Sequence, residues 1–305
     1  MSYIQADKQQ PVSKYHCVKD RNSKPSLNHP CFNNKSHNKF GRIHLPVSYD
    51  CNIQCRFCVR SRNDYETRPG VTRKILSPIQ SLGIIDRALR LCPEITVVGI
   101  AGPGDTLAND AALDTFFLIH QKYPQLIKCL STNGLNLPDY IDRLHNAGVQ
   151  TITVTINAVD PEIISKIVRH ILWDKKKISG VAMGKILIGR QLTGVKLAAQ
   201  LGMTIKVNTV LIPGINDSHI EEIAFTAKEL GVSIYNIIPL IPQGEFKNTN
   251  PPDCNDLKKA KALATQYIDV FEHCKHCRAD ACGIPGVNDF SSQLYQEKME
   301  TFSHG

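Results

Sequence analysis

The alternation of apolar and amphipathic segments constrains the fold of this 305-residue chain more than any other feature. From about residue 40 onward, helical patterns separate short apolar runs that resemble strands. Strands that alternate with helices form a parallel sheet, because each helix returns the chain to the same edge. The runs lie near 43–47, 95–101, 127–131, 150–156, 203–211 and 232–238. They predict an α/β fold whose sheet curls into a partial (β/α)6 barrel of the TIM type.

Composition divides the chain into three parts. Residues 1–28 are polar and lack periodicity, so we expect a flexible N-terminal arm. Residues 29–286 hold the predicted barrel with extensions at both of its ends. Residues 287–305 are polar, and we expect them to form a peripheral tail.

Two helices can be placed in detail. The clearest pattern has Asp217 as its N-cap and ends before Gly231. One face of this helix carries the apolar residues Ile220, Ile223, Ala224 and Ala227. A loop at 243–256, rich in Pro, Asn and Asp, precedes a last helix that we expect at about 256–272.

Charge and cysteine content narrow the class of protein. The net charge of +8 comes from Lys and Arg that are interleaved with acidic residues, so we do not expect nucleic-acid binding. The run Lys175-Lys176-Lys177 is most simply a solvated surface turn. No apolar run approaches the ~18 residues of a membrane span, and the N-terminus does not resemble a signal peptide. Eleven cysteines in such a chain favour reduced thiols and metal binding in a reducing cytoplasm.

Cys51, Cys55 and Cys58 form a C-x3-C-x2-C triplet directly after the first predicted strand. Three thiolates suit a [4Fe–4S] cluster with one iron free of protein ligands, whereas structural zinc usually takes four protein ligands. The free iron can chelate the amino and carboxylate groups of S-adenosylmethionine (SAM), and this spacing is the radical SAM signature. The triplet follows a strand whose C-terminal end is where such barrels carry their chemistry. We predict that the triplet cleaves SAM and that Phe57 contacts it.

A glycine-rich loop at 99–105 follows the second predicted strand. Gly102 and Gly104 would allow the backbone to approach a ligand, and Asp105 could receive its ammonium group. Because the loop follows a radical SAM triplet in the sequence, it matches the position of the segment that binds the amino group of SAM. An ordinary turn between strand and helix is the alternative, because isolated glycine clusters are weak signals.

Short polar side chains end the next strands of the predicted barrel. Ser131 and Asn133 follow the third strand, and Thr155 and Asn157 follow the fourth. They would lie at the barrel mouth, where a ribose or carboxylate could bind. Each is also a common turn former, so a purely structural role is the alternative. Asn208, a polar residue within the fifth strand, is a weaker candidate for the same site.

A second cysteine pair, Cys274 and Cys277, lies near the end of the last predicted helix. A C-x2-C pair can hold one edge of a metal centre, but it needs partners from elsewhere. His29-Pro30-Cys31 and Cys129 are the candidates. Zinc bound by the pair with two remote ligands is the alternative. No role is assigned to Cys17, Cys92 and Cys254.

These residues and their flanking segments resemble the NifB-type nitrogenase-cofactor maturases, a radical SAM family. The match runs in order from about 28 to 286, and its last segment is far more specific than the triplet alone. The segments that carry the resemblance are His29-Pro30-Cys31, 42–47, 51–55, 66–70, 99–105, 130–135, 155–162, 207–217 and 273–281.

The resemblance implies a concrete activity. In that family the triplet holds a SAM-bound cluster, and two further [4Fe–4S] clusters bind nearby as substrate. A methyl group passes from SAM to a cluster sulfide, and a 5′-deoxyadenosyl radical from a second SAM abstracts hydrogen from that carbon. The two clusters fuse with an added sulfur into an eight-iron, carbide-centered precursor. Implied partners are an iron–sulfur cluster donor, a cofactor carrier or scaffold protein, and an electron donor such as ferredoxin or flavodoxin.

The resemblance also implies residue roles. Cys51, Cys55 and Cys58 would hold the SAM cluster. Glu66 matches an acidic residue before Arg-Pro-Gly and would act as a proton or cluster-contact group. The substrate clusters would be held by His29, Cys31, Cys129, Cys274 and Cys277.

One departure from the family concerns the loop at 59–67. Family members usually carry a cysteine there as a substrate-cluster ligand, but this loop has none. Asp64 or Cys282 could replace it, one cluster could be held more loosely, or the chain could be a diverged paralog with another product.

Two other functions compete with the maturase. A different radical SAM enzyme with auxiliary clusters, acting on a small molecule or peptide, would share the triplet and the barrel. It would not need His29-Pro30-Cys31 together with the segment 273–281. A non-catalytic iron–sulfur scaffold would leave the loops at 99–105, 131–134 and 155–157 unexplained.

Overall fold

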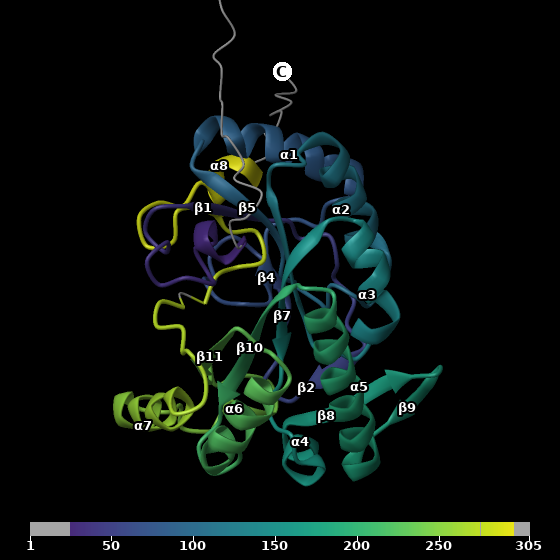
Figure 1. The fold of residues 1–305 in the computed structure, drawn as a ribbon, viewed down its shortest axis with the longest axis vertical. Helices are drawn as coiled ribbons and strands as arrows, with labels where there is room; N and C mark the ends of the chain where they lie inside the picture. Colours follow the sequence, from purple (N-terminus) through teal and green to yellow (C-terminus); the bar gives the residue numbers. More distant parts are fainter. Residues whose placement is uncertain (1–24, 275, 296–305) are drawn as a thin grey trace, which may run out of the picture.

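A curled sheet forms the centre of the computed structural model, which describes residues 25–274 and 276–295 (Figure 1). The sheet has the order β11-β10-β7-β6-β5-β1-β12, and all neighbours pair in parallel except β12, which runs antiparallel to β1. Six of its strands match the predicted apolar runs, so the partial barrel is confirmed. The strands are β1 (Gly41–His44), β5 (Ile95–Ile100), β6 (Ile127–Thr132), β7 (Val149–Thr155), β10 (Thr204–Leu211), β11 (Ile234–Pro239) and β12 (Cys282–Gly283).

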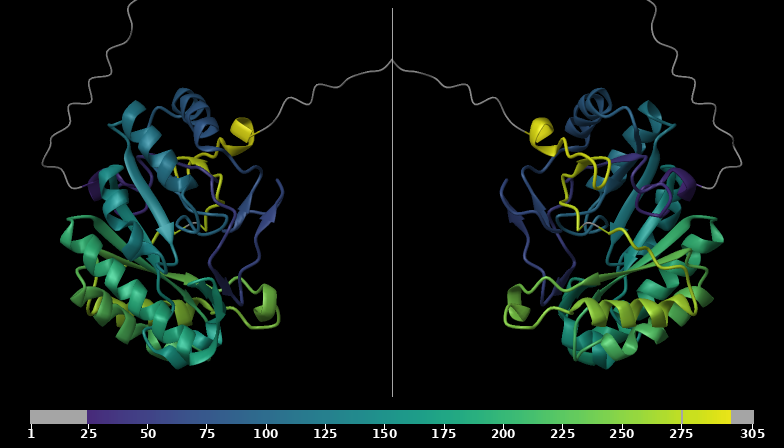
Figure 2. Two further views of the ribbon diagram at one scale, coloured as in Figure 1. Left: turned by 90° about the vertical axis from the view of Figure 1, so that its right-hand side faces the viewer. Right: turned by 90° about the vertical axis from the view of Figure 1, so that its left-hand side faces the viewer.

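Helices cover the outer side of the curled sheet, as the two side views show (Figure 2). Neighbouring helices pack against one another in the pairs α1–α2, α3–α5, α4–α5 and α6–α7. None of the helices within the described residues is long and apolar enough to span a bilayer. The helices are α1 (Pro78–Leu91), α2 (Ala111–Lys122), α3 (Leu137–Asn146), α4 (Pro161–Ile167), α5 (Gly180–Gln200), α6 (Ile220–Glu229), α7 (Cys254–Thr265) and α8 (Ser291–Tyr295).

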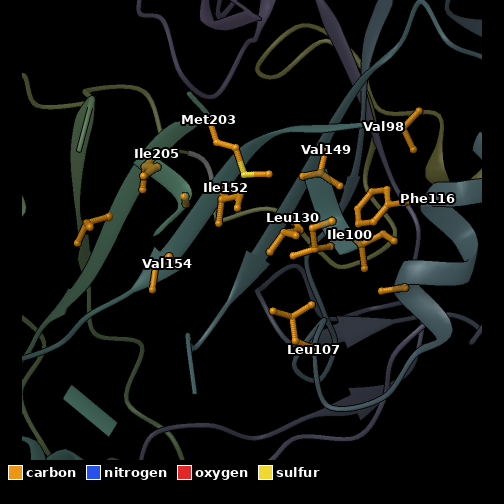
Figure 3. Close-up of a cluster of buried hydrophobic side chains, with 14 of the residues drawn as sticks. Val98, Ile100, Leu107, Phe116, Leu130, Val149, Ile152, Val154, Met203 and Ile205 are labelled. Carbon is orange, nitrogen blue, oxygen red and sulfur yellow. The ribbon is translucent and has the colours of Figure 1, made fainter. Parts of the chain in front are cut away.

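The strands carry two different faces because side chains alternate along a strand. On the outer face, Val98, Leu130 and Ile152 pack with Phe116 of α2 in the main hydrophobic core (Figure 3). Burying each such side chain contributes about 1.5–3 kcal/mol to folding. The inner face is more polar, and its side chains line a cavity. The period-two pattern therefore holds the sheet against the helices and leaves its other face for chemistry.

A small antiparallel sheet positions the cysteine triplet, and the sequence did not predict it. It consists of β2 (Ile53–Cys55), β8 (Val168–Trp173) and β9 (Lys176–Ile178), with Ile53 opposite Ile171. Lys175–Lys177 is exposed, as expected for the lysine run, but only Lys175 lies in the turn between β8 and β9, because Lys176 and Lys177 belong to β9. A second short pair joins β3 (Ser61–Arg62), which lies within the cysteine-free loop at 59–67, to β4 (Val71–Thr72) just after it.

The start of α6 differs from the predicted start. Asp217 is not its N-cap, because 217–219 form a 3₁₀ turn and the α-helix begins at Ile220. The side chain of the buried Asn216 fixes this turn, since it accepts from the N–H of Ile212 at 2.8 Å and donates to the Asn157 carbonyl at 2.9 Å. The predicted apolar face of the helix is buried, as expected.

The C-terminal segments also differ from expectation. Helix α7 ends at Thr265 instead of about 272, because residues 269–271 run alongside β11. There the N–H of Tyr235 donates to Asp269 and the N–H of Phe271 donates to Tyr235, both at 2.8 Å. The described part of the tail, 287–295, is not peripheral: Tyr295 is buried and its hydroxyl lies 3.1 Å from a β1 carbonyl.

The predicted N-terminal arm lies mostly outside the described residues. Of residues 1–28, only 25–28 are described, and they form a 3₁₀ turn. The division of the chain into arm, barrel and tail stays a prediction.

Candidate functional site

The inner face of the sheet lines a cavity of about 380 Å³. Its walls come from the inward side chains of the six parallel strands, the cysteine triplet and residues of the segments 29–37, 271–274 and 276–277. All sequence-predicted site residues line it except Gly102 and Glu66. Those that do are His29, Cys31, Cys51, Cys55, Phe57, Cys58, Gly104, Asp105, Cys129, Ser131, Asn133, Thr155, Asn157, Asn208, Cys274 and Cys277.

Backbone hydrogen bonds, one of them to the end of α4, hold the triplet in a fixed shape. The N–H of Arg56 donates to the Ile167 carbonyl at 2.9 Å, and the N–H of Cys58 donates to the Cys55 carbonyl at 3.1 Å. Burial raises the pKa of Cys51 to about 12 and that of Cys55 well above its ordinary value. Without metal these thiols are protonated at neutral pH, whereas a bound metal deprotonates its thiol ligands.

A [4Fe–4S] cluster fits the triplet better than a single ion does. The three thiols are half-buried and line one cavity. Within residues 25–274 and 276–295, no three His, Cys, Asp or Glu side chains are grouped to hold one metal ion. A cluster presents a different iron to each ligand, so its ligands need not converge on one point.

The loop at 101–105 braces the chain that enters the triplet. The N–H of Gly104 donates to Ser48 at 2.9 Å, and the N–H of Asp105 donates to Asp50 at 2.8 Å. A Cβ at position 104 would lie only 2.0 Å from the Asp50 carbonyl oxygen and 2.4 Å from that of Tyr49. Only glycine fits this approach, so the motif has a structural role in positioning the triplet.

Asp105 joins the loops that follow β5 and β6. Its carboxylate accepts from the N–H of Asn133 at 2.6 Å, the N–H of Leu107 at 2.9 Å and the Thr132 hydroxyl at 3.0 and 3.1 Å. Burial raises the pKa of Asp105, while these hydrogen bonds lower it. The carboxylate therefore acts as a brace between the loops, and its contact with a ligand ammonium group stays a prediction.

Gln191 of α5 connects the ends of two strands and was missed in the sequence. Its Nε2 donates to the carbonyls of Asn133 at 2.7 Å and Thr155 at 2.9 Å. Its Oε1 is buried without a hydrogen-bond partner among the described residues, and the side chain lines the cavity. Asn133 in turn donates to Asn52 at 2.6 Å, beside Cys51. A lone Gln within a helical pattern gives no signal of such a role.

Asn157 and Asn208 occupy the far end of the inner face. Asn157 Oδ1 accepts from the N–H of Val210 at 2.9 Å, so this side chain closes the end of β7 onto β10. Asn208 Oδ1 accepts from Asn236 Nδ2 at 3.0 Å, across paired positions of β10 and β11. Asn236 Oδ1 is buried and has no hydrogen-bond partner among the described residues. The arrangement offers an acceptor to a ligand in the cavity.

The remaining predicted thiols form a second group on the cavity wall. The pKa of Cys31 is raised to about 12, mainly by burial, and the nearby Cys277 and Cys129 act in the same direction. Lys206 opposes this effect. Cys31, Cys129 and Cys277 therefore lie within electrostatic range of one another, although they come from segments far apart in the sequence. Cys274 lines the same cavity and is exposed.

Two buried cations accompany this second thiol group, and the sequence did not identify either. Arg42 of β1 is 5% exposed, and its Nη2 donates to the Cys277 sulfur at 3.0 Å. Lys206 of β10 is 6% exposed, and its Nζ donates to the Cys31 carbonyl at 3.0 Å. The same Nζ lies 4.8 Å from the ring centre of Phe32. Lys206 lies two positions before Asn208, so strand alternation already placed it on the same face.

Two imidazoles line this part of the cavity and differ in tautomer. Nδ1 of His44 lies 3.2 Å from the Arg278 carbonyl oxygen, which can only accept, so Nδ1 carries the proton and Nε2 keeps its lone pair. Nδ1 of His29 instead accepts from the N–H of Cys31 at 3.1 Å, which leaves the proton of the neutral ring on Nε2. Burial lowers the pKa of both rings, to about 4 for His44. The sequence had suggested His29 as a ligand. In the structure, the free lone pair on Nε2 makes His44 better prepared to bind metal than His29.

Glu66 does not line the cavity. Its carboxylate accepts from Ser61, at 2.6 Å, and from Asn63 and Arg68. The Ser61 and Asn63 hydrogen bonds are the main reason that its pKa is lowered to about 2. Glu66 therefore organises its own loop, and its role as a proton or cluster-contact group stays a prediction.

Comparison with known proteins places this chain in a family. Residues 45–227 match the Radical SAM superfamily. The FeMo cofactor biosynthesis protein NifB of Methanocaldococcus jannaschii is 46% identical over 286 residues, which cover 90% of this chain and 95% of that protein. The protein of the same name from Klebsiella pneumoniae is 42% identical over 276 residues, which cover 88% of this chain and 59% of that protein.

Solved structures agree with the fold. The structure of Streptococcus suis SuiB bound to S-adenosylmethionine matches with a TM-score of 0.57 at 16% identity. The match covers 79% of this chain and 53% of the SuiB chain. A radical SAM methyltransferase from Sphaerobacter thermophilus has a TM-score of 0.53 at 18% identity, over 76% of this chain and 64% of its own. At such low identities the structural similarity supports the fold alone. The sequence relatives have much higher identities and support the family as well. The chain belongs to the radical SAM superfamily and, within it, to the NifB family of FeMo cofactor biosynthesis proteins.

Proposed function

We propose that this radical SAM enzyme fuses two [4Fe–4S] clusters into a carbide-centered, eight-iron precursor of the nitrogenase cofactor. SAM would be both the methyl donor and the radical source. One observation carries the proposal: the triplet and a second group of thiols line the same cavity. Chemistry at the triplet would thus take place next to the substrate clusters. The relatives are named FeMo cofactor biosynthesis proteins, which supports a role in making the nitrogenase cofactor.

The triplet end of the cavity would bind SAM. Cys51, Cys55 and Cys58 would hold the resident [4Fe–4S] cluster, which when bound supplies the electron that cleaves SAM reductively. The free Oε1 of Gln191 and the side chain of Asn133 offer hydrogen bonds to polar groups of SAM. The residues around them are tied to the backbone, so the ligand would meet a preorganised site.

The opposite wall would hold the substrate clusters. Cys31 and Cys129 with His44 would bind one of them, and Cys274 with Cys277 would bind the other. A cluster ligated by thiolates is anionic, so Lys206 and Arg42 would stabilise it electrostatically. Their buried positions strengthen this effect, because screening by water is weak there.

The proposed reaction requires partner proteins that supply clusters and electrons and that accept the product. The enzyme would receive iron–sulfur clusters from a donor protein and electrons from a ferredoxin or flavodoxin. It would pass the product to a carrier or scaffold protein. The reduced thiols favour a cytoplasmic location.

Selective removal of thiols tests the proposal. In anaerobically reconstituted protein, Cys31→Ala/Cys129→Ala should lower the iron content by about four atoms per chain while 5′-deoxyadenosine still forms from SAM. Changing the triplet to alanine should abolish 5′-deoxyadenosine and leave the other iron bound. The eight-iron product should require all of these thiols. Stoichiometric zinc, with iron for only one cluster, would contradict the proposal and favour a different radical SAM enzyme.

A further inference from the structure

The loop at 59–67 raises the question of which group completes the ligand set of Cys274 and Cys277. The loop has no cysteine, yet it lies against the segment that carries the pair. The Arg278 guanidinium donates to two carbonyls of the loop, those of Glu66 and, at 2.8 Å, Asn63. The N–H of the next residue, 279, donates to residue 71 at 2.9 Å. A loop ligand would therefore have approached the cluster beside residues 276–279.

Neither substitute suggested by the sequence reaches the cavity. Asp64 is exposed and does not line it. Cys282 is fully buried in β12, opposite Ile43, and does not line it either. Burial raises the pKa of Cys282 to about 12, and the nearby buried thiol of Cys92 acts in the same direction. A third protein ligand for this cluster would therefore come from another residue.

Two histidines in the same segment line the cavity, and their surroundings differ. The ring of His273 stacks on His37 at 5.1 Å with an interplanar angle of 23°. It also meets the edge of Phe271 at 6.2 Å. His276 is half-buried, and no hydrogen bond or ring contact engages its side chain among the described residues. The ring of His273 is therefore held by aromatic packing, whereas the His276 ring is available.

The backbone turns His276 toward the cavity. Consecutive side chains of an extended chain point to opposite sides, yet His276 and Cys277 both line the cavity. His276 has a φ of 49°, in the left-handed region that non-glycine residues rarely adopt. Such strained conformations concentrate at functional sites. The left-handed residue is what allows neighbouring side chains to face the same space.

We propose that the His276 imidazole is the third protein ligand of the substrate cluster held by Cys274 and Cys277, in place of the loop cysteine. The inference rests on the proposed function, because it assumes a cluster at this pair. A neutral imidazole nitrogen donates its lone pair to iron without releasing a proton. Histidine replaces cysteine in this way in Rieske clusters, where it raises the reduction potential. A neutral ligand also leaves the cluster less negative, which suits a substrate that must be released.

Nitrogen coupling to the cluster tests this ligand. Protein with ¹⁵N-labelled histidine is reconstituted in a Cys31→Ala/Cys129→Ala background, which removes the other substrate cluster. Pulsed EPR of the reduced protein without SAM should show one strongly coupled nitrogen. His276→Gln should abolish the coupling and lower the iron content by up to about four atoms per chain. The matched variant His273→Gln should keep both, and His276→Cys should restore the iron without the nitrogen coupling.

The outcomes separate the ligand from the function. A fully loaded cluster without nitrogen coupling, or coupling that survives in His276→Gln, overturns the His276 assignment alone. Coupling lost in His273→Gln but kept in His276→Gln assigns the role to the other histidine and overturns the proposal. If Cys274→Ala/Cys277→Ala leaves the iron content unchanged, no cluster binds there. The proposed function then fails together with the ligand.

Discussion

Gly104→Ala adds one methyl group where the loop at 101–105 contacts the chain that leads into the triplet. The new Cβ would lie 2.0 Å from the Asp50 carbonyl oxygen and 2.4 Å from that of Tyr49. Real Cβ contacts are not shorter than 3.0 Å, so one backbone segment must move by at least about 1 Å. Both obstacles are main-chain atoms and cannot rotate away. The shift would therefore reach Cys51, one residue after Asp50.

The structure sets the size of the expected effect. The shift would weaken two hydrogen bonds, from Gly104 to Ser48 and from Asp105 to Asp50, at about 1 kcal/mol each. Overpacking adds about 1–3 kcal/mol. A domain stabilised by more than about 5 kcal/mol, as most are, would stay folded. A misplacement of about 1 Å at a reacting group costs on the order of 100-fold in rate.

The assay separates folding from chemistry. For Gly104→Ala we expect a cooperative urea transition, a loss of triplet iron measured before SAM is added, and about 100-fold slower 5′-deoxyadenosine formation. Gly189→Ala is the matched control, because Gly189 lies exposed inside α5 with nothing within 4 Å of an added Cβ. It should stabilise the protein by about 0.5–1 kcal/mol and leave cleavage unchanged. A Gly104→Ala enzyme with normal iron and a rate within about twofold of wild type would refute this reasoning.

Three further changes test the supporting contacts. Asp280→Asn leaves the buried Arg278 without its carboxylate partner at 2.8 Å, so the free energy of unfolding in urea should fall by about 3–5 kcal/mol at neutral pH. Burial acts to raise the pKa of Asp280, but hydrogen bonds from Arg278 and Arg73 hold it below its ordinary value. Wild type should therefore lose this stability as the pH falls below about 4, and the variant should show a smaller acid loss. Lys206→Met keeps the side-chain length but removes the charge, and should deplete the iron outside the triplet, measured by metal analysis with EPR. Gln191→Leu leaves two carbonyls without their donor, so the unfolding free energy should fall by about 1–3 kcal/mol and SAM binding should weaken in equilibrium dialysis.

The strands of the main sheet could be predicted because each has a continuous apolar side that faces helices. Val98 in β5 and Leu130 in β6 are examples, since both are fully buried. The hairpin of β8 and β9 could not be predicted in the same way. It becomes a strand pair by pairing with β2, whose Ile53 lies opposite Ile171, far away in the sequence. Tertiary pairing decided its structure, and local propensity did not.

The end of α7 shows the same competition. The sequence after Thr265 continues with helix-compatible residues, so the amphipathic pattern predicted a longer helix. In the structure, Val270 instead forms a bridge with Tyr235 of β11. The backbone groups on that exposed edge of the sheet gain partners in this way. A gain from a distant strand is not visible in the local pattern.

Site residues that belong to sequence motifs could be predicted, whereas single polar residues on the inner face of the sheet were harder to identify. The triplet and the loop at 99–105 follow strands directly, so their location follows from the barrel. Glu66 was selected by family position alone, and its contacts show that it organises its own loop. His44 and Lys206 were missed because polar residues within apolar strands give weak individual signals. Alternation along β10 from Asn208 would have identified Lys206.

The buried cations carry the strongest physical argument about what the cavity binds. No carboxylate of the described residues pairs with Arg42 or Lys206, and Nε of Arg42 is buried without a hydrogen-bond partner. A buried charge without a carboxylate in direct contact is costly, so the folded protein would gain stability from an anion bound near both cations. Arg42 donates to the Cys277 sulfur, and both cations act electrostatically on the Cys31 thiol, whose pKa burial raises to about 12, so that this thiol stays protonated without metal. A thiolate-ligated cluster supplies both the metal and the negative charge. It would therefore offset the cost of the buried cations and the cost of deprotonating a buried thiol together.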